Sequence, residues 1–186
     1  MKKLYFLIMF LLTPVVLLSQ DFKVDVKNSN IEWVGKKITG SHNGTIALKN
    51  GFITIDENDN ITNGKFTLNM ESILCTDLTG AKKGYLEEHL KDEDFFNTSK
   101  YPTATFEVTK SNTNTIIGIL TIKEISQEVE FEYTKINTHE YKADIIIDRT
   151  LFDITYKSKS AFPIKYADNF IYDDFSISLN PIIFQK

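Results

Sequence analysis

Apolar and polar residues alternate with a period of two over several stretches of the chain. In one of these stretches Phe66, Leu68 and Met70 alternate with Thr67 and Asn69. Successive side chains of a β-strand point to opposite faces of its sheet, so each stretch predicts a strand with one dry face. The clearest runs are residues 65–70, 104–109, 128–133 and 175–180.

Short polar segments separate these runs. Residues 57–60 and 112–114 are rich in Asn and are interpreted as hairpin loops, as are residues 123–126 and 137–140. Asn50-Gly51 coincides with a shift in the phase of the apolar positions, which favours a β-bulge within one strand over a hairpin tip. About eight strands result, at the short spacing that is typical of a β-sandwich or a β-barrel.

One segment, residues 80–92, has a helical pattern instead. Its apolar stripe would have to lie on the sheet or across the mouth of a barrel, because the chain offers no second helix to pair with it. Two phenylalanines follow at once and would extend this apolar lid. The fold class is therefore all-β with one short helix. The stripe consists of Tyr85, Leu86, His89 and Leu90, and the phenylalanines are Phe95 and Phe96.

The first 20 residues have the order of a secretory signal peptide. Lys2 and Lys3 precede an apolar run, and the chain turns polar from Ser19 onwards. A membrane anchor is the alternative, but the run is short for a bilayer span and Pro14 interrupts it. We expect residues 1–20 to be removed, which leaves one domain at residues 21–186 in the periplasm or secreted beyond it.

The charge of this domain limits its partners. Removal of two lysines leaves 21 − 2 = 19 basic residues against 25 acidic ones, a net charge of −6. This balance argues against nucleic acid or an anionic membrane surface as a partner. Arg149 is the single arginine of the chain, so a cluster that clamps phosphate is not expected. The oligomeric state stays open, and a homodimer is one alternative.

Catalytic and metal-binding chemistry receives little support. Cys75 is the single cysteine, which excludes an internal disulfide and fits a buried thiol. His42, His89 and His139 lie in different segments without the spacing of metal ligands. We therefore predict no catalytic residue, no metal and no cofactor. The apolar positions alone leave open whether the interior is a filled core or a tunnel.

Six segments carry a family resemblance. They read W-V-G-K at 33–36, S-H-N-G-T at 41–45, D-L-T at 77–79, H-L-K-D-E-D-F-F at 89–96, Y-P-T-A-T-F at 101–106 and G-I-L-T-I at 118–122. In their order and spacing they resemble the YceI family over residues 22–184. Members of that family are exported, lipocalin-like barrels that bind polyisoprenoids.

The resemblance implies an antiparallel up-and-down barrel of about eight strands around a long apolar pocket. A polyprenyl chain or an isoprenoid quinone would occupy the pocket, and a polar headgroup would lie at the mouth. The implied wall residues are Trp33, Phe66, Leu68, Met70, Phe106, Val108, Leu120, Ile122, Phe131, Phe175 and Ile177. Leu86, Leu90, Phe95 and Phe96 would line or cover the mouth. The headgroup would meet Lys82, Lys83, Lys91, Tyr85 and Tyr101.

Two positions depart from the family pattern, since Glu124 and Asp153 stand where the family usually has Gly. Glu124 puts the geometry of its hairpin in question, whereas Asp tolerates left-handed backbone better than most residues. Neither residue belongs to the implied wall of the pocket.

Three alternative functions remain. The first is a small outer-membrane barrel, whose dry face would point outward to lipid; the charged helix and the short dry runs argue against stable membrane insertion. The second is a lipid-modifying isomerase or cyclase, for which Tyr133 is the nearest candidate. The third is a protein-binding module in the response to envelope stress.

The signal peptide leads to a direct prediction. The exported protein begins at Gln20 or Asp21, because the polar region starts there. N-terminal sequencing of protein from the periplasmic fraction measures this, and an intact Met1 in that fraction would contradict it.

Overall fold

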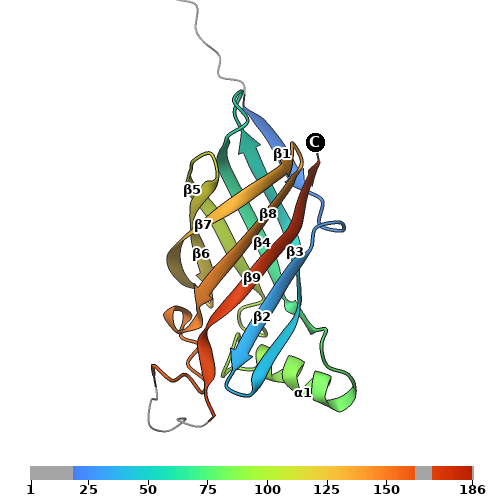
Figure 1. Ribbon diagram of the computed structural model, residues 1–186, viewed down its shortest axis with the longest axis vertical. Coiled ribbons are helices and arrows are strands. Elements are labelled where there is room, and N and C mark those ends of the chain that lie inside the picture. The colour runs from blue at the N-terminus through green and yellow to red at the C-terminus, as the bar shows by residue number, and fades with distance from the viewer. Residues whose placement is uncertain (1–18, 162–168, 186) are drawn as a thin grey trace, which may run out of the picture.

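The computed structural model describes residues 19–161 and 169–185, so most of the predicted signal peptide lies outside the described residues. Strands make up most of this part of the chain, together with one α-helix and one 3₁₀ turn (Figure 1). The strands are β1 (Gln20–Val24), β2 (Ile31–Lys37), β3 (Gly40–Ile55), β4 (Ile61–Cys75), β5 (Thr103–Ser111), β6 (Thr115–Ile122), β7 (Ile125–Asn137), β8 (Glu140–Asp148) and β9 (Ile171–Gln185). The helix α1 spans Gly80–Lys91, and the 3₁₀ turn η1 spans Arg149–Phe152.

The strands form a closed antiparallel barrel. From β2 to β9 each strand pairs with the next, and β9 pairs with β2 to close the sheet. β1 and β2 lie end to end, because both strands pair with β3 on one side and with β9 on the other. β1 pairs with them near Ile53 and Phe184, and β2 pairs with them near Gly44 and Ile177. β1 and β2 therefore share one of eight positions around the barrel. The predicted up-and-down barrel of about eight strands is confirmed.

The alternation in the sequence becomes an inside and an outside of this barrel. Burial alternates residue by residue along β6 and β7. On β7 the side chains of Glu128, Glu130 and Glu132 are exposed, while Val129 and Phe131 point inward. The dry face is thus the inner face.

The predicted bulge at Asn50-Gly51 is confirmed. β3 runs through this pair without a turn, and the register with β4 shifts between Leu48 and Asn50. A Cβ atom on Gly51 would lie 2.7 Å from the ring of Phe66, so a larger residue would collide with an inward-facing side chain. The hairpin loops predicted at 57–60 and 112–114 connect β3 to β4 and β5 to β6.

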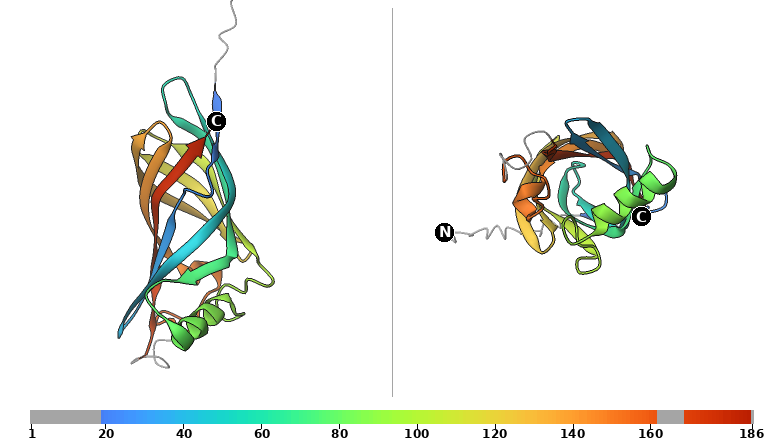
Figure 2. Two further views of the ribbon diagram at one scale, coloured as in Figure 1. Left: turned by 90° about the vertical axis from the view of Figure 1, so that its right-hand side faces the viewer. Right: turned by 90° about the horizontal axis from the view of Figure 1, so that it is seen from below.

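Helix α1 lies at one end of the barrel (Figures 1 and 2). We call this the α1 end. The bounds of the helix match the prediction to within one residue, but its orientation does not. Leu90 is buried and Leu86 packs against the core, whereas Tyr85 is 72% exposed. Tyr85 was therefore wrongly predicted to belong to the inward stripe.

Polar contacts explain this rotation of the helix. Lys83 Nζ donates a hydrogen bond of 2.6 Å to the carbonyl oxygen of Cys75, and Glu87 accepts one of 2.7 Å from the Cys75 N–H. Lys83 and Glu87 share a helix face with Leu86 and Leu90, because residues three and four apart are neighbours. Anchoring this face to the end of β4 turns Tyr85 toward solvent.

The two departures from the family pattern both occur in left-handed backbone. Lys123 and Glu124 form a two-residue turn between β6 and β7, with φ values of 52° and 63°. Asp153 follows η1 with a φ of 55°. A turn with two positive φ values suits the right-handed twist of a hairpin and normally contains Gly or Asn. The hairpin therefore forms in spite of Glu124, at a cost in backbone strain.

Relief of this strain is measurable. We expect Glu124→Gly to raise the free energy of unfolding by about 1 kcal/mol, since a β-carbon in left-handed backbone costs roughly that much. Urea denaturation measures the change. Glu124→Ala is the matched control, because it removes the charge and keeps the β-carbon. Equal stability of the two variants would show that the charge, and not the backbone, matters here.

Candidate functional site

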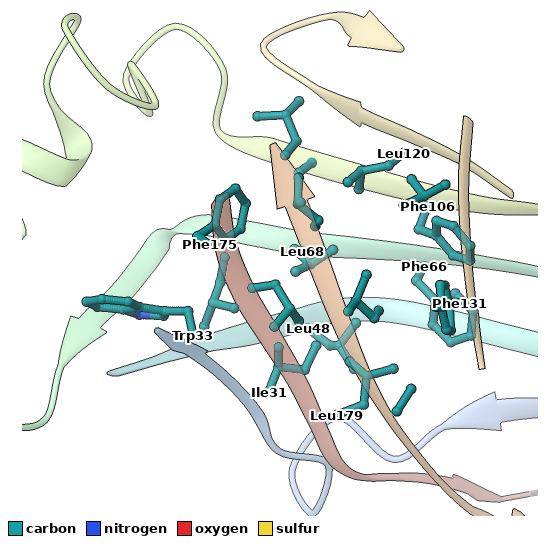
Figure 3. Close-up of a pocket in the computed structure, with 18 of the residues that line it drawn as sticks. Ile31, Trp33, Leu48, Phe66, Leu68, Phe106, Leu120, Phe131, Phe175 and Leu179 are labelled. Atoms are coloured by element: carbon teal, nitrogen blue, oxygen red, sulfur yellow. The ribbon is translucent and has the colours of Figure 1, made fainter. Parts of the chain in front are cut away.

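An apolar cavity of about 210 Å³ lies inside the barrel. Every strand from β2 to β9 contributes side chains to its wall, and Leu90, Phe95 and Phe96 contribute at the α1 end. The close-up in Figure 3 shows Trp33, Leu68, Phe106 and Phe175 among the side chains around this space. An apolar cavity of about 150 Å³ already stays dry and takes up benzene in another protein.

The exposure of the wall residues shows that the middle of the barrel is hollow. Phe66, Leu68, Phe106 and Phe131 point inward, yet they are only partly buried. In a filled core such side chains would lose nearly all their accessible surface. Their remaining surface faces the cavity. The question that composition left open is thereby answered: the interior is a cavity.

Thirteen of the fifteen residues predicted for the pocket line this cavity. They are Trp33, Phe66, Leu68, Met70, Leu90, Phe95, Phe96, Phe106, Leu120, Ile122, Phe131, Phe175 and Ile177. Leu86 packs against the core from α1 without reaching the cavity wall. Val108 is buried beside Gly64, and the register of β5 shifts directly after it. The expected wall residue Val108 therefore belongs to the packed part of the barrel.

Sequence reasoning missed the wall contributed by β3 and β8. Ile46 and Leu48 of β3 line the cavity, and so do Tyr141, Ala143 and Ile145 of β8. Residues 141–147 carry the same period-two alternation as the strands that were recognised. The alternation is hard to recognise in the sequence because Ile146 occupies an outward position, where it is 71% exposed.

The end of the cavity opposite α1 is closed by aromatic side chains. Tyr141 lies near the start of β8 and pairs with Ile182 near the end of the chain. Its ring contacts Tyr133 and Phe184, with centroid distances of 5.8 and 5.6 Å. Phe184 in turn contacts Phe66 at 6.1 Å. We call this the closed end of the cavity.

Both tyrosines of the closed end keep their protons. Burial raises the pKa of Tyr133, whose hydroxyl donates a long hydrogen bond of 3.4 Å to the carbonyl oxygen of Asn112. Burial, with smaller contributions from Tyr133 and Asp59, raises the pKa of Tyr141 to about 12. The Tyr141 hydroxyl is buried and has no hydrogen-bond partner among the residues that the structure describes.

Arg149 has a structural role near the α1 end. It is 2% exposed and donates hydrogen bonds to the carbonyl oxygens of Ile154, Ile171 and Tyr172 at 2.7, 3.1 and 3.1 Å. Its guanidinium group also lies 5.7 Å from the centre of the Phe95 ring. Burial lowers the pKa of Arg149, and nearby acids oppose this effect. The single arginine thus holds η1 to the start of β9.

The residues predicted to meet a headgroup differ in their availability. Lys83 is occupied by Cys75 and by Glu87, whose carboxylate lies 3.3 Å from its amine. Lys82 and Tyr85 are exposed on α1, while Lys91 and Tyr101 are half-buried. Within the described part of the chain no hydrogen bond or ion pair joins any two of these five residues.

Asp77 brings together two residues that the sequence had kept apart. Its carboxylate lies 2.8 Å from His42 Nδ1 and accepts hydrogen bonds from the Asn43 N–H at 3.0 Å and from Cys75 Sγ at 3.2 Å. One carboxylate thus contacts both His42 and Cys75. Local spacing could not show this contact, because His42 lies on β3 and Asp77 in the connection from β4 to α1.

This cluster fastens the loop before α1 to β3 and does not form a nucleophilic site. The aspartate lies between the histidine and the thiol, so the histidine does not take the proton of the thiol. Burial, and then the hydrogen bond to Asp77, raises the pKa of Cys75. Burial alone would raise the pKa of Asp77, but the hydrogen bonds from Asn43, His42 and Cys75 outweigh it and lower this pKa to about 2.

The other two histidines pack against aromatic rings. His89 contacts the rings of Tyr156 and Phe95 at 4.4 and 5.5 Å, and burial lowers its pKa. His139 contacts the ring of Phe22 at 5.4 Å. Within residues 19–161 and 169–185 no three His, Cys, Asp or Glu side chains are grouped so that they could hold a metal ion. No helix in this part of the chain is long and apolar enough to span a membrane.

A closed antiparallel barrel around an apolar cavity defines the class of the up-and-down β-barrels. Within this class the chain belongs to the YceI family, since the model of the YceI-like domain matches residues 22–181. The resemblance expected from the six sequence segments is confirmed. A comparison with curated proteins gave no match.

Solved structures of low sequence identity share the fold. BcnA of Burkholderia cenocepacia superposes with a TM-score of 0.62 at 17% identity, over 88% of this chain and 99% of BcnA. A polyisoprenoid binding domain from Saccharophagus degradans gives 0.55 at 11% identity, over 88% and 97% of the two chains. A mutant of the Campylobacter jejuni YceI protein gives 0.53 at 16%, over 100% and 94%.

The Asp77 cluster predicts a pH dependence of stability. A carboxyl group whose pKa is lowered by folding stabilises the fold above its unfolded pKa, here 3.8, and loses this effect as the pH falls to about 2. The free energy of unfolding of the wild type should decrease as the pH is lowered from 3.8 to about 2, and we expect this decrease to be smaller in Asp77→Asn. Denaturant titrations at several pH values measure it.

Glu128→Gln is the control for this experiment, because Glu128 is exposed on the outer face of β7. If the free energy of unfolding of Asp77→Asn decreased at low pH by as much as that of the wild type, the result would contradict the role of the cluster.

Proposed function

We propose that the protein binds a long apolar lipid, of polyisoprenoid or isoprenoid-quinone type, inside the barrel. The observation that carries this proposal is the hollow interior with an apolar wall. Transfer of hydrocarbon from water to such a wall contributes about 0.8 kcal/mol for each CH₂ group. A prenyl chain can therefore be held by burial alone, without a charged partner in the cavity.

Two further observations support an isoprenoid as the ligand class. One solved structure with the same fold is a polyisoprenoid binding domain. The wall also mixes rings, such as Phe66 and Phe131, with branched side chains, such as Leu68 and Ile177. This uneven apolar surface suits a chain that carries methyl branches along its length.

Binding is a better account of this interior than catalysis. An isomerase or cyclase needs a group in the cavity that accepts or gives a proton near neutral pH. Tyr133 was the nearest candidate, but its pKa and that of Tyr141 are both raised, so these phenols keep their protons. The Cys75 thiol is buried and hydrogen-bonded to Asp77. We infer a binding protein.

The outer face favours a barrel surrounded by water over one embedded in a bilayer. Glu128, Glu130 and Glu132 are exposed along β7, and Lys65 forms an ion pair with Glu107 across β4 and β5. Charged side chains facing lipid would be costly near the middle of a membrane. Together with the signal peptide expected at residues 1–20, this supports a domain of residues 21–186 exported to the periplasm.

Filling the cavity tests the proposed function. We expect Leu68→Trp to weaken binding of farnesol by about tenfold or more, because the indole occupies space that the ligand needs, while the thermal midpoint shifts by only a few degrees. Retention of tritiated farnesol by lipid-free protein in gel filtration measures binding.

Thr67→Trp is the matched control, since the next residue of a strand points to the opposite face. Binding should be unchanged in this variant. A wild-type protein that retains no farnesol, combined with a strongly destabilised Leu68→Trp variant, would indicate a filled core and contradict the proposal.

A further inference from the structure

Three phenylalanine rings form a layer inside the barrel. Phe66, Phe106 and Phe131 come from β4, β5 and β7. The ring of Phe106 contacts the other two rings, with centroid distances of 6.4 Å to Phe66 and 5.5 Å to Phe131. Figure 3 shows these rings on one side of the cavity, with Trp33 and Phe175 on the other side. We call the layer of three rings the aromatic floor.

The accessible surface of the cavity ends at the aromatic floor. Six inward side chains between the floor and the closed end have exposed fractions of only 3% to 9%. They are Ile61, Ile116, Tyr133, Tyr141, Ile182 and Phe184. On the α1 side of the floor, Leu68, Phe175 and Ile177 keep accessible surface that faces the cavity. A chain that enters the cavity from the α1 end therefore stops against the three rings.

A glycine on the strand between β5 and β7 makes room for the floor. β6 lies between these two strands, and the ring of Phe106 lies over Gly118 of β6. A Cβ atom on Gly118 would lie 2.7 Å from Phe106 Cε2 and even closer to Cζ. Any larger residue at this position would thus push the Phe106 ring away from the wall and into the lumen.

We propose that the aromatic floor sets the length of the prenyl chain that the barrel encloses, and that Gly118 is the positioning residue that holds Phe106 at the level of the floor. The rings offer no hydrogen-bonding group, so the deepest part of the ligand is hydrocarbon and any polar group lies nearer to α1. This inference rests on the proposed function and adds a limit on chain length to it.

A series of prenyl alcohols tests the proposal, from geraniol, with two isoprene units, to solanesol, with nine. Competition with tritiated farnesol in gel filtration measures the affinity of lipid-free protein for each alcohol. In the wild type the affinity should rise with each unit, because each unit buries more hydrocarbon, until the chain reaches from the floor to the α1 end. The affinity should then level off, and we call this chain length the limit.

Phe106→Ala should move the limit one isoprene unit higher, because the ring that it removes is about as large as one such unit. The first alcohol beyond the wild-type limit should bind this variant about tenfold more tightly than the alcohol one unit shorter, a gain that the wild type lacks. Phe106→Leu removes less of the side chain and should show a smaller gain in the same direction, so a poorly folded alanine variant does not decide the test.

Gly118→Ala should act in the opposite direction and lower the limit by one unit, because the Phe106 ring then projects into the lumen. The added Cβ would also lie 2.6 Å from the carbonyl oxygen of Glu107, so the thermal midpoint is measured in parallel. A loss of stability alone would lower the affinity for all alcohols alike, whereas the proposal predicts a change of the limit.

Phe175→Ala is the matched control, because it removes the same ring from the α1 end of the cavity. Its limit should equal that of the wild type, whatever happens to the affinities themselves. A wild-type affinity that rises over the whole series, or an unchanged limit in Phe106→Ala, would overturn the inference and leave the proposed function intact. If no alcohol binds the wild type, both fail.

Discussion

Pairing between β9 and β2 closes the sheet, and the properties of the interior follow from this closure. In a closed barrel every second side chain points inward, so the alternation of the sequence becomes an apolar lumen surrounded by a polar surface. A barrel with eight positions can be filled by its side chains or can hold one small ligand, and here the side chains leave a cavity of about 210 Å³. Phe66, Leu68 and Phe131 accordingly keep surface that faces empty space. The chain needs no disulfide to hold this shape, because the sheet has no free edge along its closed part.

Different interactions stabilise the two ends of the barrel. At the α1 end, polar contacts do most of the positioning: Cys75 is held by Lys83 and Glu87 through its backbone and by Asp77 through its thiol. At the closed end, rings pack on rings, and a single hydroxyl is left over. The lumen between the two ends has an almost entirely apolar surface, which suits an apolar ligand.

Much of this architecture could be predicted from the sequence, because period-two alternation and turn composition are local signals. The bulge at Gly51 and the bounds of α1 were predictable for the same reason. The orientation of the Tyr85 side chain could not be predicted, because it depends on the hydrogen bond between Glu87 and Cys75, which the helical pattern does not encode. The contact between His42 and Asp77 also escaped prediction, because it joins segments that only the closed barrel brings together. The exposed Ile146 concealed the alternation of β8, and with it Tyr141.

The claim that the barrel encloses a lipid is tested most directly by native mass spectrometry of the protein purified from its own host. The account predicts a complex with one bound lipid, which is released on denaturation and whose fragments repeat the mass of an isoprene unit. The mass of the ligand-free chain alone, with no lipid in the denatured extract, would contradict it.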